Sequence, residues 1–337
     1  MQIRHKPLRE QVIVITGASS GIGLATARAA ASRGARVVLA ARNGAALDDI
    51  AQDIQERGGE ARAVVTDVSS RAEVEALAAE AIRAYGGFDT WVNNAGLSIF
   101  GRLEEVSDAD HRRLFDVNFW GIVYGSTVAL QHLKKRGGAL VNLGSIASDL
   151  AFPIQGMYCA SKHAIKGFTD ALRMELQEEG APVSVTLIKP ASIDTPFPEH
   201  ARNYMARAPK LPPPVYDPAD VAKAILYAAE NGPRDLYVGG GGKMMSSLRK
   251  RVPSITDWMG AQVMSRTQKA GAAGPDRDGA LYAAGRDGAV RGASPHHVMR
   301  SAYTQASVTP VLTGLLLAGA TAAAASLLAR SDRPSRD

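Results

Sequence analysis

Short apolar runs alternate with longer helix-like stretches through the first two-thirds of this 337-residue chain. The apolar runs are hydrophobic throughout, which is typical of strands covered on both faces of a sheet. Such alternation, with short connections, requires right-handed crossovers and a doubly wound parallel sheet. We therefore expect an α/β fold with helices on both faces of one sheet. The expected strands are Val12–Thr16, Arg36–Ala40, Ala61–Thr66, Thr90–Asn93, Ala139–Leu143, Ser184–Ile188 and Leu236–Val238.

The composition changes after about residue 250, which suggests a division of the chain. We expect residues 1–250 to form a single domain. Residues 251–307 are basic and rich in Gly and Ala with little apolar periodicity, and this indicates a flexible linker. Residues 308–330 are expected to form a hydrophobic helix, and residues 331–337 a polar tail.

A glycine-rich turn separates the first expected strand from the helix-like stretch after it. Gly17 permits a tight turn, Gly21 lets the backbone approach a pyrophosphate, and Gly23 allows close helix–strand packing. The N-terminus of the following helix offers free N–H groups and the positive end of its dipole to phosphates. A glycine triplet in this strand–turn–helix context predicts a dinucleotide-binding loop.

Four further motifs follow in order along the chain. Asn93–Gly96 reads Asn-Asn-Ala-Gly directly after the fourth expected strand, and Asn118 stands in a helix-like segment. Ser145 follows the fifth expected strand. Tyr158 and Lys162 are four residues apart, a spacing that places both side chains on one face of a helix. Each motif alone is common, and the conjunction is what carries information.

Together with the spacing Thr-Gly-x-x-x-Gly-x-Gly, these motifs resemble the short-chain dehydrogenase/reductase family over about residues 8–245. The resemblance implies a Rossmann-like catalytic domain that moves a hydride between NADP(H) and a carbonyl or alcohol substrate. Tyr158 would be the general acid/base, with a pKa lowered by the ammonium of Lys162 and by the oxidised nicotinamide. Lys162 would also hold the nicotinamide ribose, and Ser145 would hydrogen-bond the substrate oxygen. Asn118 would hold a water in a proton relay.

The end of the second expected strand carries no acidic residue, and Arg42 follows it. An acidic residue there hydrogen-bonds the adenosine ribose in NAD enzymes, whereas a guanidinium pairs with the 2′-phosphate of NADP. We therefore expect NADP(H) to be preferred over NAD(H), the alternative being that Arg42 is a solvated loop residue. By resemblance, the cofactor contacts are Thr16, Gly17, Ser19, Ser20, Gly21, Ile22, Gly23, Arg42, Asp67, Val68, Asn94, Ala95, Gly96, Tyr158, Lys162, Pro190, Ile193 and Thr195.

Residues 192–218 are rich in proline and are expected to form a loop over the site. The apolar side chains of this loop suit an apolar or aromatic substrate, or else pack against the domain. Ala191, just before it, stands where the family usually has glycine. Because a Cβ limits positive φ and close backbone approach, this substitution bears on the local conformation at Ala191, though not on the cofactor site as a whole.

The composition indicates which partners and cross-links are expected, among nucleic acids, metals, disulfides and other copies of the chain. The net charge is +6, but aromatic residues make up only 6% of the chain, so a platform that stacks nucleic-acid bases is not expected. The single cysteine, Cys159, excludes an internal disulfide and a four-cysteine zinc site, and it fits a reducing compartment. We expect no metal. Family members commonly pair long helices, so a homo-oligomer, dimer or tetramer, is expected through residues 101–133 and 161–179.

The run Val311–Ala329 contains no charged residue. As a helix it would be about 28 Å long, close to the ~30 Å hydrocarbon core of a bilayer. We expect it to associate with a membrane and to anchor a cytoplasmic catalytic domain, since the N-terminus shows no signal peptide. The alternative is an apolar helix packed on the domain or on a partner.

Two other functions compete with hydride transfer on carbonyls or alcohols. One is a catalytically inactive, membrane-tethered scaffold that binds NADP, which the complete set of Asn118, Ser145, Tyr158 and Lys162 disfavours. The other is a sugar-nucleotide epimerase or dehydratase on a related fold. The glycine spacing and the lack of a large C-terminal substrate lobe disfavour the second function.

Overall fold

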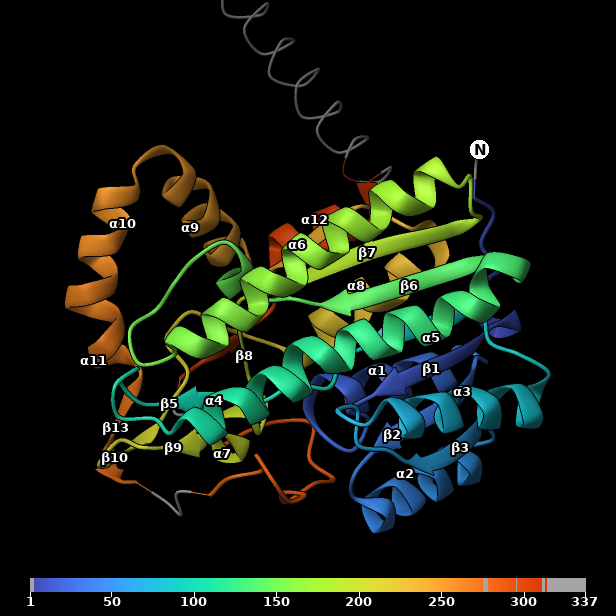
Figure 1. The fold of residues 1–337 in the computed structure, drawn as a ribbon, viewed down its shortest axis with the longest axis horizontal. Coiled ribbons are helices and arrows are strands. Elements are labelled where there is room, and N and C mark those ends of the chain that lie inside the picture. Colours follow the sequence, from blue (N-terminus) through green and yellow to red (C-terminus); the bar gives the residue numbers. More distant parts are fainter. Residues whose placement is uncertain (1–2, 275–277, 295, 311–312, 314–337) are drawn as a thin grey trace, which may run out of the picture.

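A computed structural model describes residues 3–274, 278–294, 296–310 and 313 of the chain. The main strands are β1 Val12–Thr16, β2 Arg36–Ala41, β3 Glu60–Val65, β4 Thr90–Asn93, β6 Gly138–Leu143, β7 Val183–Pro190 and β12 Asp235–Val238. They form one seven-stranded sheet in the order β12-β7-β6-β4-β1-β2-β3, in which every neighbouring pair is parallel (Figure 1). The strand order runs outward in both directions from β1 and β4. This is the doubly wound, Rossmann-like fold that the sequence predicts.

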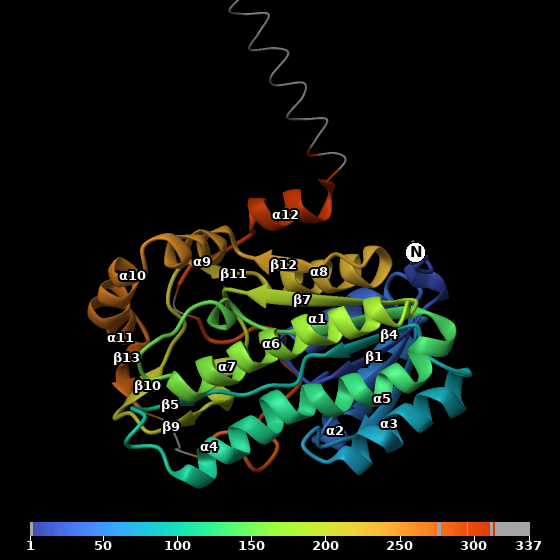
Figure 2. The same cartoon turned by 45° about the horizontal axis from the view of Figure 1, so that its top comes forward.

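Helices cover both faces of the sheet, and each layer of helices shares a buried apolar cluster with the strands (Figure 2). The first layer comprises α1 Gly21–Ala31, α2 Gly44–Glu56 and α8 Pro218–Asn231. The second comprises α3 Arg71–Tyr85, α5 Gly121–Arg136 and α6 Gly156–Glu178. Strand β1 shows why its sequence is apolar throughout: Ile13 and Ile15 enter the first cluster, whereas Val12 and Val14 enter the second.

Shorter elements connect these layers and surround the carboxyl edge of the sheet. They are η1 Leu8–Glu10, β5 Ile99–Phe100, α4 Asp108–Phe115, η2 Asp116–Trp120, η3 Ile146–Ser148, β8 Ser192–Ile193, α7 Phe197–His200, β9 Arg202–Asn203, β10 Arg207–Pro209, β11 Val215–Tyr216, α9 Gly240–Arg251, α10 Pro253–Met259, η4 Gly260–Met264, α11 Ser265–Thr267, β13 Lys269–Ala273, β14 Val298–Met299 and α12 Ala302–Val308. Between residues 192 and 217 no element exceeds the four residues of α7, in agreement with the predicted loop.

Residues 251–307 differ from the flexible linker that their composition indicates. Strand β13 pairs antiparallel with β10, and β14 pairs parallel with β11. Between β13 and β14, residues 278–294 form an irregular segment that we call the strap, coloured orange in Figure 1. The strap packs on the domain because Leu281 is buried and Arg291 pairs with Asp217 at 2.7 Å. The division of the chain into a domain of residues 1–250 and the segments after it stays a prediction.

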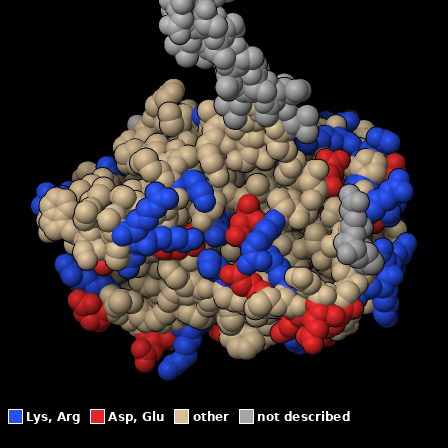
Figure 3. Space-filling model, turned by 90° about the horizontal axis from the view of Figure 1, so that it is seen from above, with Lys and Arg blue, Asp and Glu red and all other residues tan. Residues whose placement is uncertain are grey.

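The predicted hydrophobic helix lies almost wholly outside the described residues. Within the described part of the chain, no helix is long and apolar enough to cross a membrane. Figure 3 shows the face seen from above Figure 1, where basic and acidic side chains are interspersed among uncharged ones. A continuous basic stripe, such as nucleic-acid backbones require, is not seen on this face.

Candidate active site

A cavity of about 270 Å³ lies at the carboxyl ends of β1, β2, β4, β6 and β7. It sits where the strand order reverses direction, which is the place where open α/β sheets bind ligands. Ser145, Tyr158 and Lys162 line this cavity, as do most of the predicted cofactor contacts. Thr16, Gly23 and Asn118 do not line it. These three residues support the loops and helices that form the cavity wall.

The turn between β1 and α1 is tied to the turn after β4. The hydroxyl oxygen of Thr16 accepts the N–H groups of Asn94 and Ala95 at 3.0 and 3.2 Å. The amide of Asn94 donates back to the carbonyls of Thr16 and Gly17 at 2.9 and 3.1 Å. A Cβ on Gly23 would lie 2.0 Å from the carbonyl oxygen of Gly17, so only glycine permits this close approach. The predicted phosphate loop is therefore held rigidly at the floor of the cavity.

The three polar side chains at the other end of the cavity come from β6 and α6. Ser145 caps η3, and its hydroxyl oxygen accepts the N–H of Ala147 at 3.0 Å. Tyr158 lies in the first turns of α6, and Lys162 follows one turn later. The ammonium of Lys162 donates to the carbonyl of Leu143 at 2.8 Å and lies 5.8 Å from the ring centre of Tyr158. The end of β6 and the start of α6 thus hold the predicted acid/base beside a cation.

Burial dominates the electrostatics of this end of the cavity. It raises the pKa of Tyr158 above the ordinary value, an effect that a hydrogen bond with Ser145 opposes. It lowers the pKa of Lys162 to about 8. Among the protein side chains alone, burial therefore raises the pKa of Tyr158, which is the opposite of the effect expected from Lys162. A bound oxidised nicotinamide, whose ring is positive, would lower this pKa.

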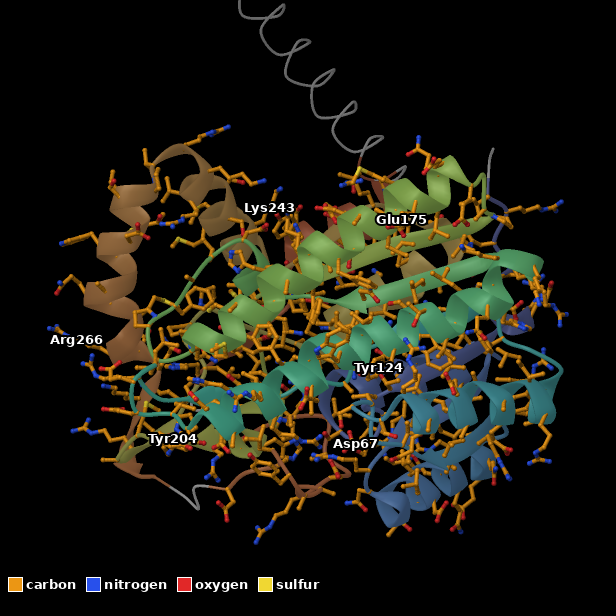
Figure 4. All side chains as sticks on the ribbon, viewed as in Figure 1. Asp67, Tyr124, Glu175, Tyr204, Lys243 and Arg266 are labelled. Carbon is orange, nitrogen blue, oxygen red and sulfur yellow. The ribbon has the colours of Figure 1, made fainter. Side chains whose placement is uncertain are left out.

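At the part of the cavity where β2 ends, two arginines are bound to the strap. Arg42 donates to the backbone carbonyls of Ala280 and Leu281. Arg113 donates to the same carbonyl of Leu281 at 3.2 Å and pairs with Asp67 at 2.7 Å. Asp67 follows β3 and is labelled in Figure 4. Arg42, which is predicted to bind a 2′-phosphate, thus lines the cavity. It also holds the strap, whose position at the cavity could not be predicted from the sequence.

Sequence reasoning missed this contribution of the strap to the cavity. Ala280, Ala284, Gly285 and Asp287 all line it. The strap has no apolar periodicity and no motif, and its small residues are those of a flexible linker. The only local signal is the pair Leu281 and Tyr282, which interrupts the Gly/Ala composition.

Ala191 has a φ outside the positive range, so its Cβ causes no backbone strain at this position. Among the described residues, Ile154 is the only non-glycine residue with positive φ. The N–H of Ala191 donates to the carbonyl of Val238 at 2.9 Å, so the residue continues the sheet contact of β7 with β12. Alanine fits here because the position uses ordinary φ values.

Several large apolar side chains line the same cavity as Tyr158. Phe152 and Phe197 line it, together with Leu211 from the predicted loop and Met264 from η4. The ring of Phe197 meets that of Tyr158 edge to face, with centroids 5.6 Å apart. Within the described part of the chain, no three His, Cys, Asp or Glu side chains are placed to hold a metal ion.

Comparisons with known proteins find similar sequences over most of the chain. The family model described as short chain dehydrogenase matches residues 11–205. An uncharacterised oxidoreductase of Bacillus subtilis, YxnA, is 45% identical over 329 residues, which are 96% of this chain and 92% of that protein.

Two solved structures also match. A short-chain dehydrogenase/reductase from Burkholderia phymatum in complex with NAD has 29% identity and a TM-score of 0.65, covering 76% of this chain and 96% of that one. An alcohol dehydrogenase from Thermococcus sibiricus, complexed with 5-hydroxy-NADP, has 30% identity and a TM-score of 0.59, covering 68% of this chain and 94% of that one.

Proposed function

This chain belongs to the short-chain dehydrogenase family, and we propose that it is an NADP(H)-dependent oxidoreductase acting on carbonyl or alcohol groups. One observation carries the proposal. A single cavity is lined both by the glycine loop, with Gly17 and Gly21, and by Ser145, Tyr158 and Lys162. This arrangement suits a dinucleotide whose phosphates lie on the N-terminus of α1 and whose reactive ring lies beside Tyr158.

The side chains have complementary roles in reduction of a carbonyl. The bound cofactor supplies the hydride, which forms the new C–H bond at the carbonyl carbon. Tyr158 donates its phenolic proton to the carbonyl oxygen, so that hydride and proton together give the alcohol. Ser145 donates a hydrogen bond to the same oxygen as negative charge develops on it. Lys162 stabilises the resulting phenolate by its charge. Oxidation of an alcohol is the same sequence in reverse.

The preference for NADP(H) rests on the residues after β2. Strand β2 ends at Ala41, and Arg42 and Asn43, which follow it, line the cavity. A guanidinium carries five donors, and the strap takes two of those of Arg42, so donors remain for a 2′-phosphate. The solved relatives named above bind NAD in one case and an NADP derivative in the other, so the family accommodates both.

The substrate is proposed to be an apolar carbonyl compound or alcohol. Phe152, Phe197, Leu211 and Met264 offer apolar surface to the cavity that Tyr158 also lines, and the ring of Phe197 lies against that of Tyr158. Burial of apolar substrate area against such a wall favours binding at about 25 cal/mol per Å². Small polar substrates would gain little from it.

Oxidation of NADPH in the presence of a panel of aliphatic, aromatic and polycyclic ketones and aldehydes tests the proposal. We expect turnover with the larger apolar members, and loss of turnover in Tyr158→Phe. Tyr124→Phe is the control, because Tyr124 lies on α5, outside the cavity, and the substitution keeps its ring over Arg71. Failure of the wild type to bind reduced cofactor or to turn over any carbonyl would contradict the proposal. Binding without turnover would favour the scaffold function.

We further propose that residues 311–329 anchor a cytoplasmic catalytic domain to a membrane. The support is the uncharged run itself and its length as a helix, because the structure describes only Thr313 of these residues. Cell fractionation of the full chain and of a variant ending at Ser307 tests this proposal. The full chain should sediment with membranes at low and high salt, and the shortened variant should not. A full chain that stays in the supernatant would contradict anchoring.

A further inference from the structure

The strap closes the end of the cavity at which β2 ends. One of its fixed points is Leu281, which is 0% exposed and whose carbonyl accepts from Arg42 and Arg113. The other is Arg291, whose guanidinium pairs with Asp217 at 2.7 Å and with Asp194 at 3.5 Å. A segment held at both ends across a cavity mouth has little freedom to move its middle residues.

Between these points the strap pairs with the phosphate loop. The N–H of Gly288 donates to the carbonyl of Ser19 at 2.9 Å, and the carbonyl of Ala289 accepts the N–H of Gly21 at 2.9 Å. Two backbone hydrogen bonds on consecutive residues set the register of strap against loop. This register places Asp287, the residue before Gly288, at the cavity wall.

Asp287 faces the two residues that follow β2. Its carboxylate accepts the amide N–H of Asn43 at 3.0 Å. The orientation of that amide is fixed, because the oxygen of Asn43 accepts the N–H of Ala46 to cap α2, which leaves the nitrogen facing Asp287. Asp287 also acts on Arg42: burial lowers the pKa of that guanidinium, and the carboxylates of Asp67 and Asp287 oppose the lowering.

We propose that Asp287 sets the discrimination between the two nicotinamide cofactors, as a carboxylate that the strap brings to the two residues after β2, which are the residues expected to meet a 2′-phosphate. The inference rests on the proposed function. Asp287 occupies the amide donor of Asn43 and faces Arg42, both of which a 2′-phosphate would use. Its charge repels that phosphate, whereas it accepts a hydrogen bond from a free 2′-hydroxyl. The acidic residue that β2 lacks is thus supplied from the strap, more than two hundred residues later in the chain.

The charge of Asp287 opposes the effect of Arg42 on the cofactor. Arg42 attracts the 2′-phosphate, Asp287 repels it, and the ratio of the two affinities reflects their difference. A purely structural role for Asp287, in which its bond to Asn43 only holds the strap in place, predicts no change in this ratio when the charge is removed.

Asp287→Asn separates these two roles. The asparagine keeps an oxygen that can accept from Asn43 but carries no charge. Asp278→Asn is the matched control: it is the same change in the same strap, at a residue that pairs with Arg202 and does not line the cavity. Each protein, as the full chain, is titrated with NADPH and with NADH, and binding is followed by the fluorescence of the reduced nicotinamide.

We expect Asp287→Asn to tighten NADPH binding by about tenfold, as loss of a nearby like charge in a partly buried site implies. NADH binding should be unchanged or weaker, and Asp278→Asn should leave both affinities as in the wild type. Equal changes for the two cofactors, or none for either, would overturn the role of Asp287 while leaving the proposed function intact. A wild-type protein that binds neither cofactor would instead overturn the proposed function, and this inference with it.

Discussion

The side chain of Asn118 makes a two-way hydrogen bond with the backbone of Leu97. The N–H of Leu97 donates to the amide oxygen at 2.8 Å, and the amide nitrogen donates to the carbonyl of Leu97 at 2.9 Å. That nitrogen also reaches the hydroxyl of Ser161 at 3.2 Å, the residue before Lys162 on α6. Asn118 therefore ties the chain after β4 to the helix that carries Tyr158 and Lys162. The water relay expected of Asn118 stays a prediction, and the structure shows its side chain as a clamp.

Removal of this clamp should destabilise the protein. Asn118→Leu leaves the buried N–H and carbonyl of Leu97 without the amide partner, a loss of roughly 1–3 kcal/mol in the free energy of unfolding. Urea denaturation measures it. Asn231→Leu on the exposed end of α8 is the control, expected to change stability by less than about 0.5 kcal/mol. If Asn118→Leu is as stable as the wild type, the hydrogen bonds of Asn118 make no net contribution to the free energy of unfolding.

Lys162 should give the protein a pH-dependent stability. Burial lowers its pKa to about 8, whereas an unfolded lysine titrates near ~10.4. Between these values the unfolded chain binds a proton that the folded protein does not, so this residue makes stability rise with pH from about 8 to about 10. Lys162→Met should abolish that contribution. The wild type should therefore gain stability relative to the variant across this interval in urea denaturation, and a constant difference would contradict the burial effect.

Arg42→Asp should weaken use of NADPH far more than use of NADH. The substitution places a negative charge beside the expected 2′-phosphate, close to the carboxylates of Asp67 and Asp287. It also removes the two bonds to the strap, so a smaller loss with NADH is expected as well. The ratio of kcat/KM for the two cofactors decides the matter. Equal losses would mean that Arg42 serves only to hold the strap.

The strands could be predicted closely because their signal is local. Predicted and observed bounds coincide for β1 and β4, where every residue is buried. A parallel strand with helices on both faces is buried along its length, so most of its residues are apolar and its sequence reveals it, although β4 also buries Thr90 and Asn93. Ser145 and Tyr158 could be predicted from motifs, one just after β6 and the other in the first turn of α6. In the structure both residues line the same cavity.

The strap could not be predicted because its contacts are distant in sequence and mostly made by backbone atoms. Carbonyls of Ala280 and Leu281 hold Arg42, and backbone groups of Gly288 and Ala289 hold the phosphate loop. Every residue type has a backbone carbonyl, and every type except proline has a backbone N–H, so neither composition nor periodicity predicts these contacts.

The exposed aromatic surface beside α5 and α6 is expected to form the contact between subunits. Trp120 is 43% exposed and Met174 on α6 is 65% exposed. The ring of Trp120 lies against that of Tyr124, with centroids 5.7 Å apart, and Tyr124 is labelled on α5 in Figure 4. Charging this surface with Trp120→Glu should turn a homo-oligomer into monomers. Light scattering measures the mass, and a monomeric wild type, or an unchanged mass in the variant, would contradict this assignment.

Transfer of a deuterium label tests the central claim most directly. NADPH carrying deuterium at both C4 positions is incubated with the protein and an apolar ketone that the wild type turns over. We predict one deuterium on the carbinol carbon of the alcohol, and a loss of several orders of magnitude in rate for Tyr158→Phe because the transferable proton is gone. Product without deuterium, or a Tyr158→Phe variant that keeps more than about a tenth of the rate, a loss of only ~1.4 kcal/mol, would contradict hydride transfer with Tyr158 as the proton donor.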